Sequence, residues 1–228
     1  MVIEISNLSY SYDGNEVLSN ISLSIKEKDF TAVIGRNGSG KTTLMKLILG
    51  LLDMQKGTIN IFGKSIKNFN EWDNVGYVPQ KYNIDKNFPA NVDEILSLKN
   101  NFQKEKITKM LKIFNLLDKK FSDLSGGQQQ RVMIALSLMS NPKLIILDEP
   151  TVGVDIKAQQ EFYALLKKLN KDIGVTIVLV THDVSLVSKF VKNVICLNGN
   201  ICCCGKAHDT EKLLKQVYGK EFRIHHHY

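Results

Sequence analysis

The sequence predicts an α/β fold with a mostly parallel sheet, and three patterns indicate it. A glycine-rich stretch at 35–43 lies between a short apolar run at 30–34 and apolar residues that recur at helical spacing. Two further runs, 144–147 and 175–180, are apolar throughout, which is typical of strands buried on both faces of a parallel sheet. We therefore expect these three runs to be strands of one sheet that helices cover.

The beginning of the chain has the alternating pattern of an antiparallel strand pair. The turn residues Asp13-Gly14-Asn15 separate the two alternating segments. Short apolar runs at 58–62 and 75–78 predict two more strands, the second ended by Pro79. The apolar residues of the alternating segments are Ile3, Ile5 and Leu8, then Ile21, Leu23 and Ile25.

Helical spacing marks the segments that should cover the sheet. The glycine-rich stretch is followed by one such pattern, residues 80–142 carry helical and no strand patterns, and a third helix is expected between 147 and 175. The apolar positions are Leu44, Leu47, Ile48, Leu51 and Leu52; Ile107, Met110, Leu111, Phe114 and Leu117; and Phe162, Leu165, Leu166 and Leu169.

The end of the chain predicts a hairpin of strands at 194–197 and 201–204. The dipeptide Asn198-Gly199 between them is a strong two-residue turn signal. A last helix is expected near 210–218. We expect a single domain over 1–228, with a core from 1–79 and 143–228 and a helical part at 80–142.

Composition excludes several classes of protein. Of the 228 residues, 43% are hydrophobic and 23% are charged, which is ordinary for a globular chain. No apolar run is long enough to span a bilayer and no secretory signal is visible, so a cytosolic location is expected. The formal charge of +7 could favour an anionic partner, a membrane surface or solubility, and without a dense basic run no nucleic acid is expected. Adjacent cysteines at 202–204 are a poor disulfide framework, so reduced thiols are predicted.

The stretch at 35–43 has the chemistry of a phosphate cradle. Its glycines, Gly35, Gly38 and Gly40, let successive backbone N–H groups point at an anion, and the following helix adds its positive end. Lys41 supplies a mobile charge for the β- and γ-phosphates, and the Thr42 hydroxyl can ligate the accompanying Mg²⁺. The alternative is a glycine-rich turn with a surface lysine, which the strand-turn-helix context disfavours.

Two carboxylates follow the apolar run at 144–147. Asp148 and Glu149 come at the end of a buried strand, where an open α/β sheet places its ligand chemistry. Asp148 would hold Mg²⁺, and Glu149 would polarise the attacking water, because phosphoryl transfer needs a positioned nucleophile. Helix-capping acids are the alternative interpretation.

A second anion site is predicted where the sequence Leu124-Ser125-Gly126-Gly127-Gln128 begins a helical pattern. Ser125 can cap that helix, but the paired glycines exceed what a cap requires and would let the backbone approach a phosphate. Either the chain binds two nucleotides, or a second copy completes one site.

These residues resemble the motifs of the nucleotide-binding subunits of ATP-binding-cassette (ABC) transporters, and the resemblance covers nearly the whole chain. The cradle is similar to their Walker A, 144–149 to Walker B with the catalytic glutamate, and 124–128 to the signature motif. Gln80 resembles the Q-loop glutamine and His182 the switch histidine. The segment 152–155 resembles the D-loop and Tyr12 the aromatic that stacks on adenine.

Four of these residues also have plain structural interpretations. Tyr12 could pack on the sheet edge, His182 could be a satisfied buried histidine, Asp155 could be a helix N-cap, and Gln80 could be a polar residue that ends a strand. Val152-Gly153-Val154 departs from the commoner D-loop sequence, which leaves its detailed contacts open.

The resemblance implies a P-loop NTPase core that uses ATP and Mg²⁺. Catalysis would involve Glu149, His182, Lys41 and Gln80, and Mg²⁺ would be held by Thr42, Gln80 and Asp148. The ATP-binding residues would be Tyr12, Gly35, Asn37, Gly38, Ser39, Gly40, Lys41, Thr42 and Thr43.

The partners are implied in the same way. In the ATP-bound homodimer, Ser125, Gly126, Gly127 and Gln128 of one copy would face the cradle of the other, with Asp155 in the D-loop. The helical part and Gln80 would transmit motion to a membrane permease at the cytoplasmic face of the membrane, where the chain would be peripheral.

The stretch 76–92 is similar to the zinc and manganese importer branch of this family, which adds an extracytoplasmic metal-binding protein as an indirect partner. Transport of another solute, by import or export, and a soluble switch ATPase without a transport role are the alternatives. The cysteines at 202–204 and the histidines at 225–227 are metal-friendly types, but they lack fixed tetrahedral spacing and could equally be strand residues and a solvated tail or tag.

Overall fold

The computed structural model describes residues 1–80, 88–99, 103–151, 155–182 and 189–209. Its strands form two sheets, and the first is antiparallel, with the order β2-β1-β4-β5. The expected pairing of the two alternating segments is confirmed. The strands are β1 (Ile3–Tyr12), β2 (Asn15–Ile25), β4 (Lys56–Ile61) and β5 (Lys64–Ser65).

The second sheet has six strands in the order β10-β9-β3-β8-β7-β6. Its neighbours are parallel, except for the β9-β10 hairpin. The predicted fold class is therefore confirmed. The strands are β3 (Phe30–Ile34), β6 (Val75–Val78), β7 (Leu144–Asp148), β8 (Thr176–Thr181), β9 (Asn193–Asn198) and β10 (Asn200–Lys206).

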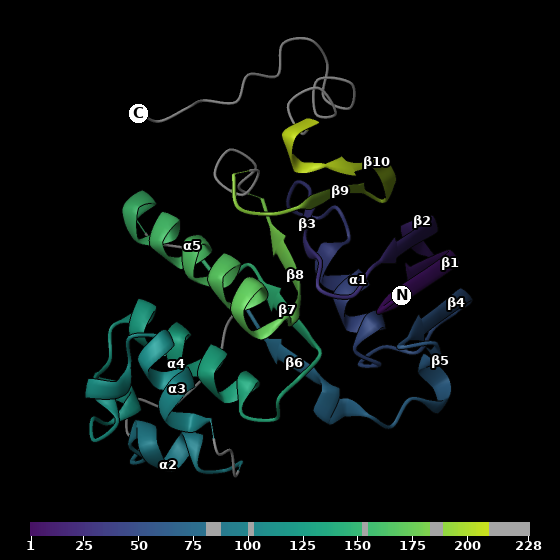
Figure 1. Ribbon diagram of the computed structural model, residues 1–228. Coiled ribbons are helices and arrows are strands. Elements are labelled where there is room, and N and C mark those ends of the chain that lie inside the picture. The colour runs from purple at the N-terminus through teal and green to yellow at the C-terminus, as the bar shows by residue number, and fades with distance from the viewer. Residues whose placement is uncertain (81–87, 100–102, 152–154, 183–188, 210–228) are drawn as a thin grey trace.

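Helices lie on both faces of the six-stranded sheet. Helix α1 (Lys41–Ile48) lies between the two sheets, and α5 (Ile156–Ile173) covers the opposite face (Figure 1). Helices α2 (Val92–Leu96), α3 (Lys104–Met110) and α4 (Gly126–Leu138) gather to one side, beyond β6 and β7. Short 3₁₀ turns occur at Ile66–Asn68, Trp72–Asn74, Phe114–Leu116, Phe121–Asp123 and Ala207–Asp209.

The central strands separate two hydrophobic cores. Val33 of β3 packs with α1 and the antiparallel sheet, whereas its neighbours Ala32 and Ile34 pack with α4 and α5. Strand β7 divides in the same way, because Ile146 joins the first core and Ile145 the second. Side chains alternate between the faces of a strand, so a strand covered on both sides must be apolar throughout.

Two predicted helices end earlier than their apolar patterns. The pattern from Ile107 to Leu117 is broken after Met110, because Lys112 adopts a left-handed φ of 55°. Phe114 consequently lies in a 3₁₀ turn and is 46% exposed. After α1, Leu51 lies outside the helix and is 62% exposed.

The prediction of reduced thiols is wrong for one pair. Cys196 of β9 lies opposite Cys203 of β10, and the two are joined by a disulfide. The sequence argument weighed only the three adjacent cysteines and missed the partner across the hairpin. Cys203 is buried and Cys204 exposed, as expected for successive residues of a strand.

Other sequence expectations are tested only in part. The described residues include no helix long and apolar enough to cross a membrane, and no cluster of three or more potential metal ligands. The helix expected at 210–218 and the histidines at 225–227 lie outside the described residues.

Substitution of Gly57 by alanine tests how closely β4 packs against β1. A Cβ built there would lie 2.6 Å from backbone atoms of Asn7 and Leu8, whereas one at Gly63 would meet nothing within 4 Å. Both residues have positive φ, so both alanine variants should lose ~1–2 kcal/mol to backbone strain. Gly57→Ala should lose a further ~1–3 kcal/mol to overpacking. Urea unfolding measures both values, and equal losses would contradict the close strand contact.

Candidate functional site

The cradle is formed where β3 ends and α1 begins. Gly40 precedes α1 with a φ of 91°, and a Cβ there would lie 2.6 Å from Leu18 Cδ2, so only glycine fits. No side chain caps the helix and its first turn contains no acidic residue. The first N–H groups of α1 therefore face the cradle and can receive an anion.

A cavity of about 440 Å³ opens at this loop. Most of the predicted cradle residues line it, together with the predicted catalytic residues Gln80 and Glu149. The lining also includes Val17 of β2, which sequence reasoning missed because a half-buried valine in an alternating strand carries no local signal. The lining residues are Val17, Asn37, Gly38, Gly40, Lys41, Thr42, Thr43, Gln80 and Glu149.

The Lys41 ammonium group is buried and surrounded by oxygen. Only 5% of Lys41 is exposed, and Nζ donates hydrogen bonds of 3.0 Å to the carbonyl oxygens of Gly35 and Arg36. Glu149 Oε1 lies 3.5 Å away. A buried charge is tolerated only when it is paired, and these three acceptors pair it.

Glu149 brings the predicted catalytic residues together. Gln80 Nε2 donates to Glu149 Oε2 over 3.0 Å, and His182 Nδ1 lies 3.6 Å from the same oxygen. The Glu149 backbone N–H donates to the Val180 carbonyl over 2.9 Å, and its φ is 43°. Such a left-handed conformation is costly for a residue with a side chain and is concentrated at functional sites.

Asp148 ends β7 as a buried carboxylate. Burial raises the pKa of Asp148, the charge of Glu149 raises it further, and a hydrogen bond with the Thr42 side chain opposes the rise. Within the described residues, Asp148 Oδ1 and Ser39 Oγ are buried without a hydrogen-bond partner. An unpartnered buried carboxylate oxygen needs a ligand, and the Asp148 carboxylate with its hydrogen-bonded Thr42 hydroxyl is a set of oxygen donors that suits Mg²⁺.

The predicted second anion site is the start of α4. Ser125 and Gln128 form a reciprocal capping box, so the capping interpretation of Ser125 is confirmed. A Cβ at Gly126 or Gly127 would meet no atom of the described residues within 4 Å. None of these residues lines the cradle cavity of the same chain.

Two further site candidates have observed structural roles. Asp155 caps α5, because its Oδ1 accepts from the Ala158 N–H over 3.0 Å, whereas residues 152–154 lie outside the description. Tyr12 packs edge-on against Tyr10 with ring centroids 4.9 Å apart, is 40% exposed, and does not line the cavity.

The β9-β10 hairpin supports the cradle from behind. The Gly199 N–H donates to the Ser39 carbonyl over 3.1 Å, and the Gly199 carbonyl accepts from the Ser19 N–H over 2.7 Å. The predicted hairpin turn thus touches the phosphate loop, a contact that no local sequence signal reveals.

The fold and this site define a nucleotide-binding P-loop protein. The sequence pattern of the family described as "ABC transporter" matches residues 18–152. The chain belongs to the ABC transporter family, as its motifs predicted.

Individual relatives agree with this assignment. The chain is 43% identical over 228 residues to the zinc uptake system ATP-binding protein ZurA of Listeria monocytogenes, an alignment that covers 93% of this chain and 89% of the relative. Among solved structures it resembles cbiO1 of Clostridium perfringens, part of the ABC transporter complex cbiONQ. That match has 30% identity, a TM-score of 0.83, and coverage of 95% and 92%. A dimeric ATP-binding cassette in a post-hydrolysis state with ADP and Pi matches at 28% identity and a TM-score of 0.75, with coverage of 90% and 98%.

Asp148 gives a pH-dependent prediction. Because the pKa of Asp148 is raised in the folded chain, its ionisation destabilises that chain, and the penalty grows as pH rises from the ordinary value of ~3.9 through the folded value. Asp148→Asn should therefore raise the Tm of the nucleotide-free chain, and by more at pH 8 than near pH 4. Differential scanning calorimetry measures this, and a Tm gain that shrinks as pH rises would contradict the raised pKa.

Proposed function

We propose that this chain is the ATP-hydrolysing subunit of a transporter that imports zinc through a separate membrane permease. Membership of the family makes it an ATPase that serves transmembrane transport. The observation that supports the chemistry is the convergence of Lys41, Gln80 and Glu149 on one cavity at the ends of β3, β6 and β7. The name of the Listeria relative supports zinc as the cargo, and it gives no support to another solute.

ATP would lie with its phosphates in the cradle. The amide groups at the start of α1 would bind phosphate oxygens, and Lys41 would exchange its contacts with Gly35, Arg36 and Glu149 for the β- and γ-phosphates. Thr42, Asp148 and Gln80 would hold Mg²⁺, which when bound offsets the charge that develops on the phosphates. Val17 would contribute an apolar wall.

Glu149 would then act on the attacking water. Its carboxylate is anchored through the backbone bond to Val180, so it can orient a water molecule and accept its proton. His182 lies beside the same carboxylate and would orient the water and the γ-phosphate. Gln80 would shift when that phosphate binds, because its amide donates to the same oxygen of Glu149.

The homodimer is supported by the start of α4. Among the described residues, none would lie within 4 Å of a Cβ at Gly126 or Gly127, so their packing gives no reason for glycine at either position. Glycine there would allow a second copy to bring its ATP against the helix N-terminus. The matching cassette whose dimer was solved with ADP and Pi supports this arrangement.

Permease subunits that cross the membrane are the second partner. The structure of cbiO1 comes from a subunit of a larger transporter complex, which supports a corresponding assembly for this chain. The chain would bind such a permease at the cytoplasmic face of the membrane. A metal-binding protein on the other side would deliver zinc without touching it.

Glu149→Gln tests the hydrolytic role. The amide cannot accept the proton of the attacking water, so kcat for ATP should fall by ~10²–10⁴-fold. ATP should still bind and should hold the chains together as a dimer, which size-exclusion chromatography with Mg²⁺ and ATP detects. Turnover within tenfold of the wild type would remove Glu149 from the mechanism.

Zinc as the cargo is tested by growth and by the zinc content of the cell from which the chain comes. Deleting the gene should slow growth at limiting zinc and lower cellular zinc. The wild-type chain should restore both, and Glu149→Gln should not. A deletion that lowers the cellular content of another metal and leaves zinc unchanged would contradict the proposed cargo.

Gly127→Ala separates folding from dimerisation. Alanine is the better helix former by ~0.5–1 kcal/mol, and its Cβ would meet no atom of the described residues within 4 Å, so the Tm should stay equal or rise. The added methyl group should crowd the ATP of a second copy and weaken the ATP-dependent dimer of a Glu149→Gln background by about tenfold or more. Sedimentation velocity measures the dimer, and an unchanged association constant would contradict the placement of Gly127 against ATP.

A further inference from the structure

Three consecutive glutamines on α4 have three different partners. The Gln128 side chain accepts from the Ser125 N–H over 3.0 Å and closes the cap of its own helix. Gln129 Nε2 donates to the Phe121 carbonyl over 3.1 Å, within the same helical part of the chain. Gln130 instead bonds to the core, because its Nε2 donates to the carbonyl of the residue that directly follows Asp148 and Glu149.

That acceptor is the Pro150 carbonyl, one residue beyond Glu149. Gln130 is only 6% exposed, so its amide exchanges little with water. A buried hydrogen bond is costly to leave unmade, because each group would lose its partner without regaining water. The positions of α4 and of the turn after Glu149 are therefore tied together.

The turn after Glu149 is also held on its other side. Thr151 Oγ1 lies 2.8 Å from the Tyr163 hydroxyl of α5, and Gln159 Nε2 donates to the Thr151 carbonyl over 3.2 Å. Residues 149–151 thus lie between α4 and α5, each of which holds them by side-chain hydrogen bonds. A movement of α4 relative to α5 must act on this turn.

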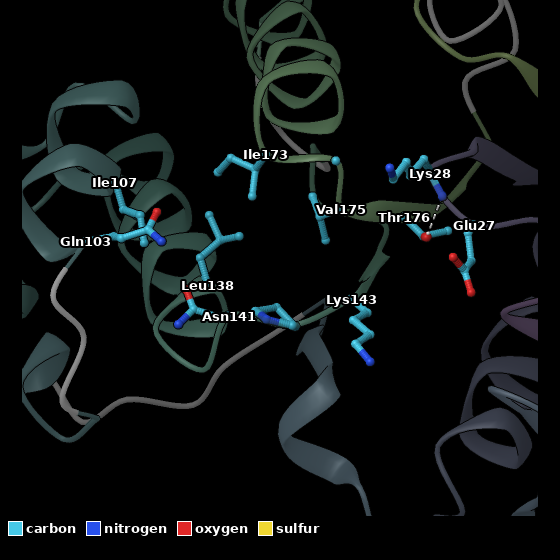
Figure 2. A pocket seen from close by; sticks show the side chains of 12 residues that line it. Glu27, Lys28, Gln103, Ile107, Leu138, Asn141, Lys143, Ile173, Val175 and Thr176 are labelled. Carbon is cyan, nitrogen blue, oxygen red and sulfur yellow. Dashed lines mark hydrogen bonds between the residues drawn. The ribbon is translucent and has the colours of Figure 1, made fainter.

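The helical part and the core are separated by a cavity near the C-terminal end of α4. Its volume is about 420 Å³, with Gln103, Ile107 and Leu138 on the helical side and Val175 and Thr176 on the core side (Figure 2). Leu138 is eight residues beyond Gln130, which is ~12 Å along the helix. The last turn of α4 borders this cavity and also packs against β6, because the Ser137 carbonyl would lie 3.1 Å from a Cβ built at Gly76. Helix α4 therefore contacts the core at both ends.

We propose that Gln130 is a positioning residue for Glu149, and that it couples the two ATP sites of the dimer. The start of α4 would contact ATP held by the second copy, an assignment that rests on the proposed function. Gln130 lies less than two helical turns further along and bonds the turn that carries this copy's own Glu149. Engagement of ATP in one site thereby sets the position of the base in the other.

The test compares Gln130→Met with Gln129→Met. Methionine has nearly the same volume as glutamine and cannot donate a hydrogen bond. Gln130→Met should lower kcat for ATP by about tenfold, the cost of one buried hydrogen bond, and should leave the KM for ATP within about twofold. Any Hill coefficient above one in the wild type should fall toward one. Gln129→Met, which loses a bond inside the helical part, should keep kcat within about twofold.

The Tm of Gln130→Met shows whether a fall in kcat comes from a general loss of stability, and a second variant provides an independent check. Should Gln130→Met fail to fold, Gln130→Glu keeps the side-chain length and also loses the donor, and it should show the same fall in kcat. Hydrogen exchange on the wild-type chain needs no substitution. Mg²⁺ and ATP should slow exchange at the start of α4 and at 149–151 together.

The outcomes that overturn the proposal are specific. A folded Gln130→Met or Gln130→Glu chain whose kcat equals that of Gln129→Met would refute it, as would hydrogen exchange that changes in only one of the two segments. A wild-type chain that does not hydrolyse ATP would instead refute the proposed function, so the two failures are separable.

Discussion

The buried ammonium group of Lys41 constrains the whole site. Lys41 is the first residue of α1 and only 5% of it is exposed, so its charge must be matched by oxygen atoms. In the nucleotide-free chain the matching atoms are the carbonyls of Gly35 and Arg36 and the carboxylate of Glu149. On the proposed function, phosphate would take over this role when Lys41 releases Glu149. Binding of the phosphate and release of the proposed base would then be parts of one exchange.

The same region places two carboxylates side by side. Asp148 is buried at the end of β7 and Glu149 follows it, so burial and then the charge of Glu149 raise the pKa of Asp148. Lys41 and the Thr42 hydroxyl offset only part of it. The positive φ of Glu149 adds backbone strain at the same point. The site thus carries unfavourable charge and backbone terms at the place where, on the proposed function, Mg²⁺ and phosphates would lie.

Local sequence patterns predicted those strands and turns whose structure depends mainly on their own residues. The apolar runs of β3, β7 and β8 and the glycines of the cradle are such patterns, because burial on both faces and close backbone approach restrict the residue types directly. The early end of α3 was missed because Lys112, which is not glycine, adopts the left-handed conformation.

The remaining omissions come from contacts between distant segments. Val17 reaches the cavity from β2, Gly199 supports the cradle from the β9-β10 hairpin, and Cys196 meets Cys203 across that hairpin. Nothing in the residues themselves distinguishes these positions from ordinary strand and turn residues. Motif order predicted roles for the site residues, but the convergence of Gln80 and His182 on one oxygen of Glu149 needs the three-dimensional structure.

On the proposed function, the start of α4 would connect these constraints to a second copy of the chain. Its capping box satisfies groups at the helix end from within, and no described residue would lie within 4 Å of a Cβ at Gly126 or Gly127. The cradle cavity of the same chain does not include these residues. On the proposed function, one chain would carry two unlike halves, a cradle for its own ATP and a helix start for the ATP of a second copy. Since Gln130 joins that helix to the turn after Glu149, the half offered to the partner and the base used by the chain itself cannot move independently.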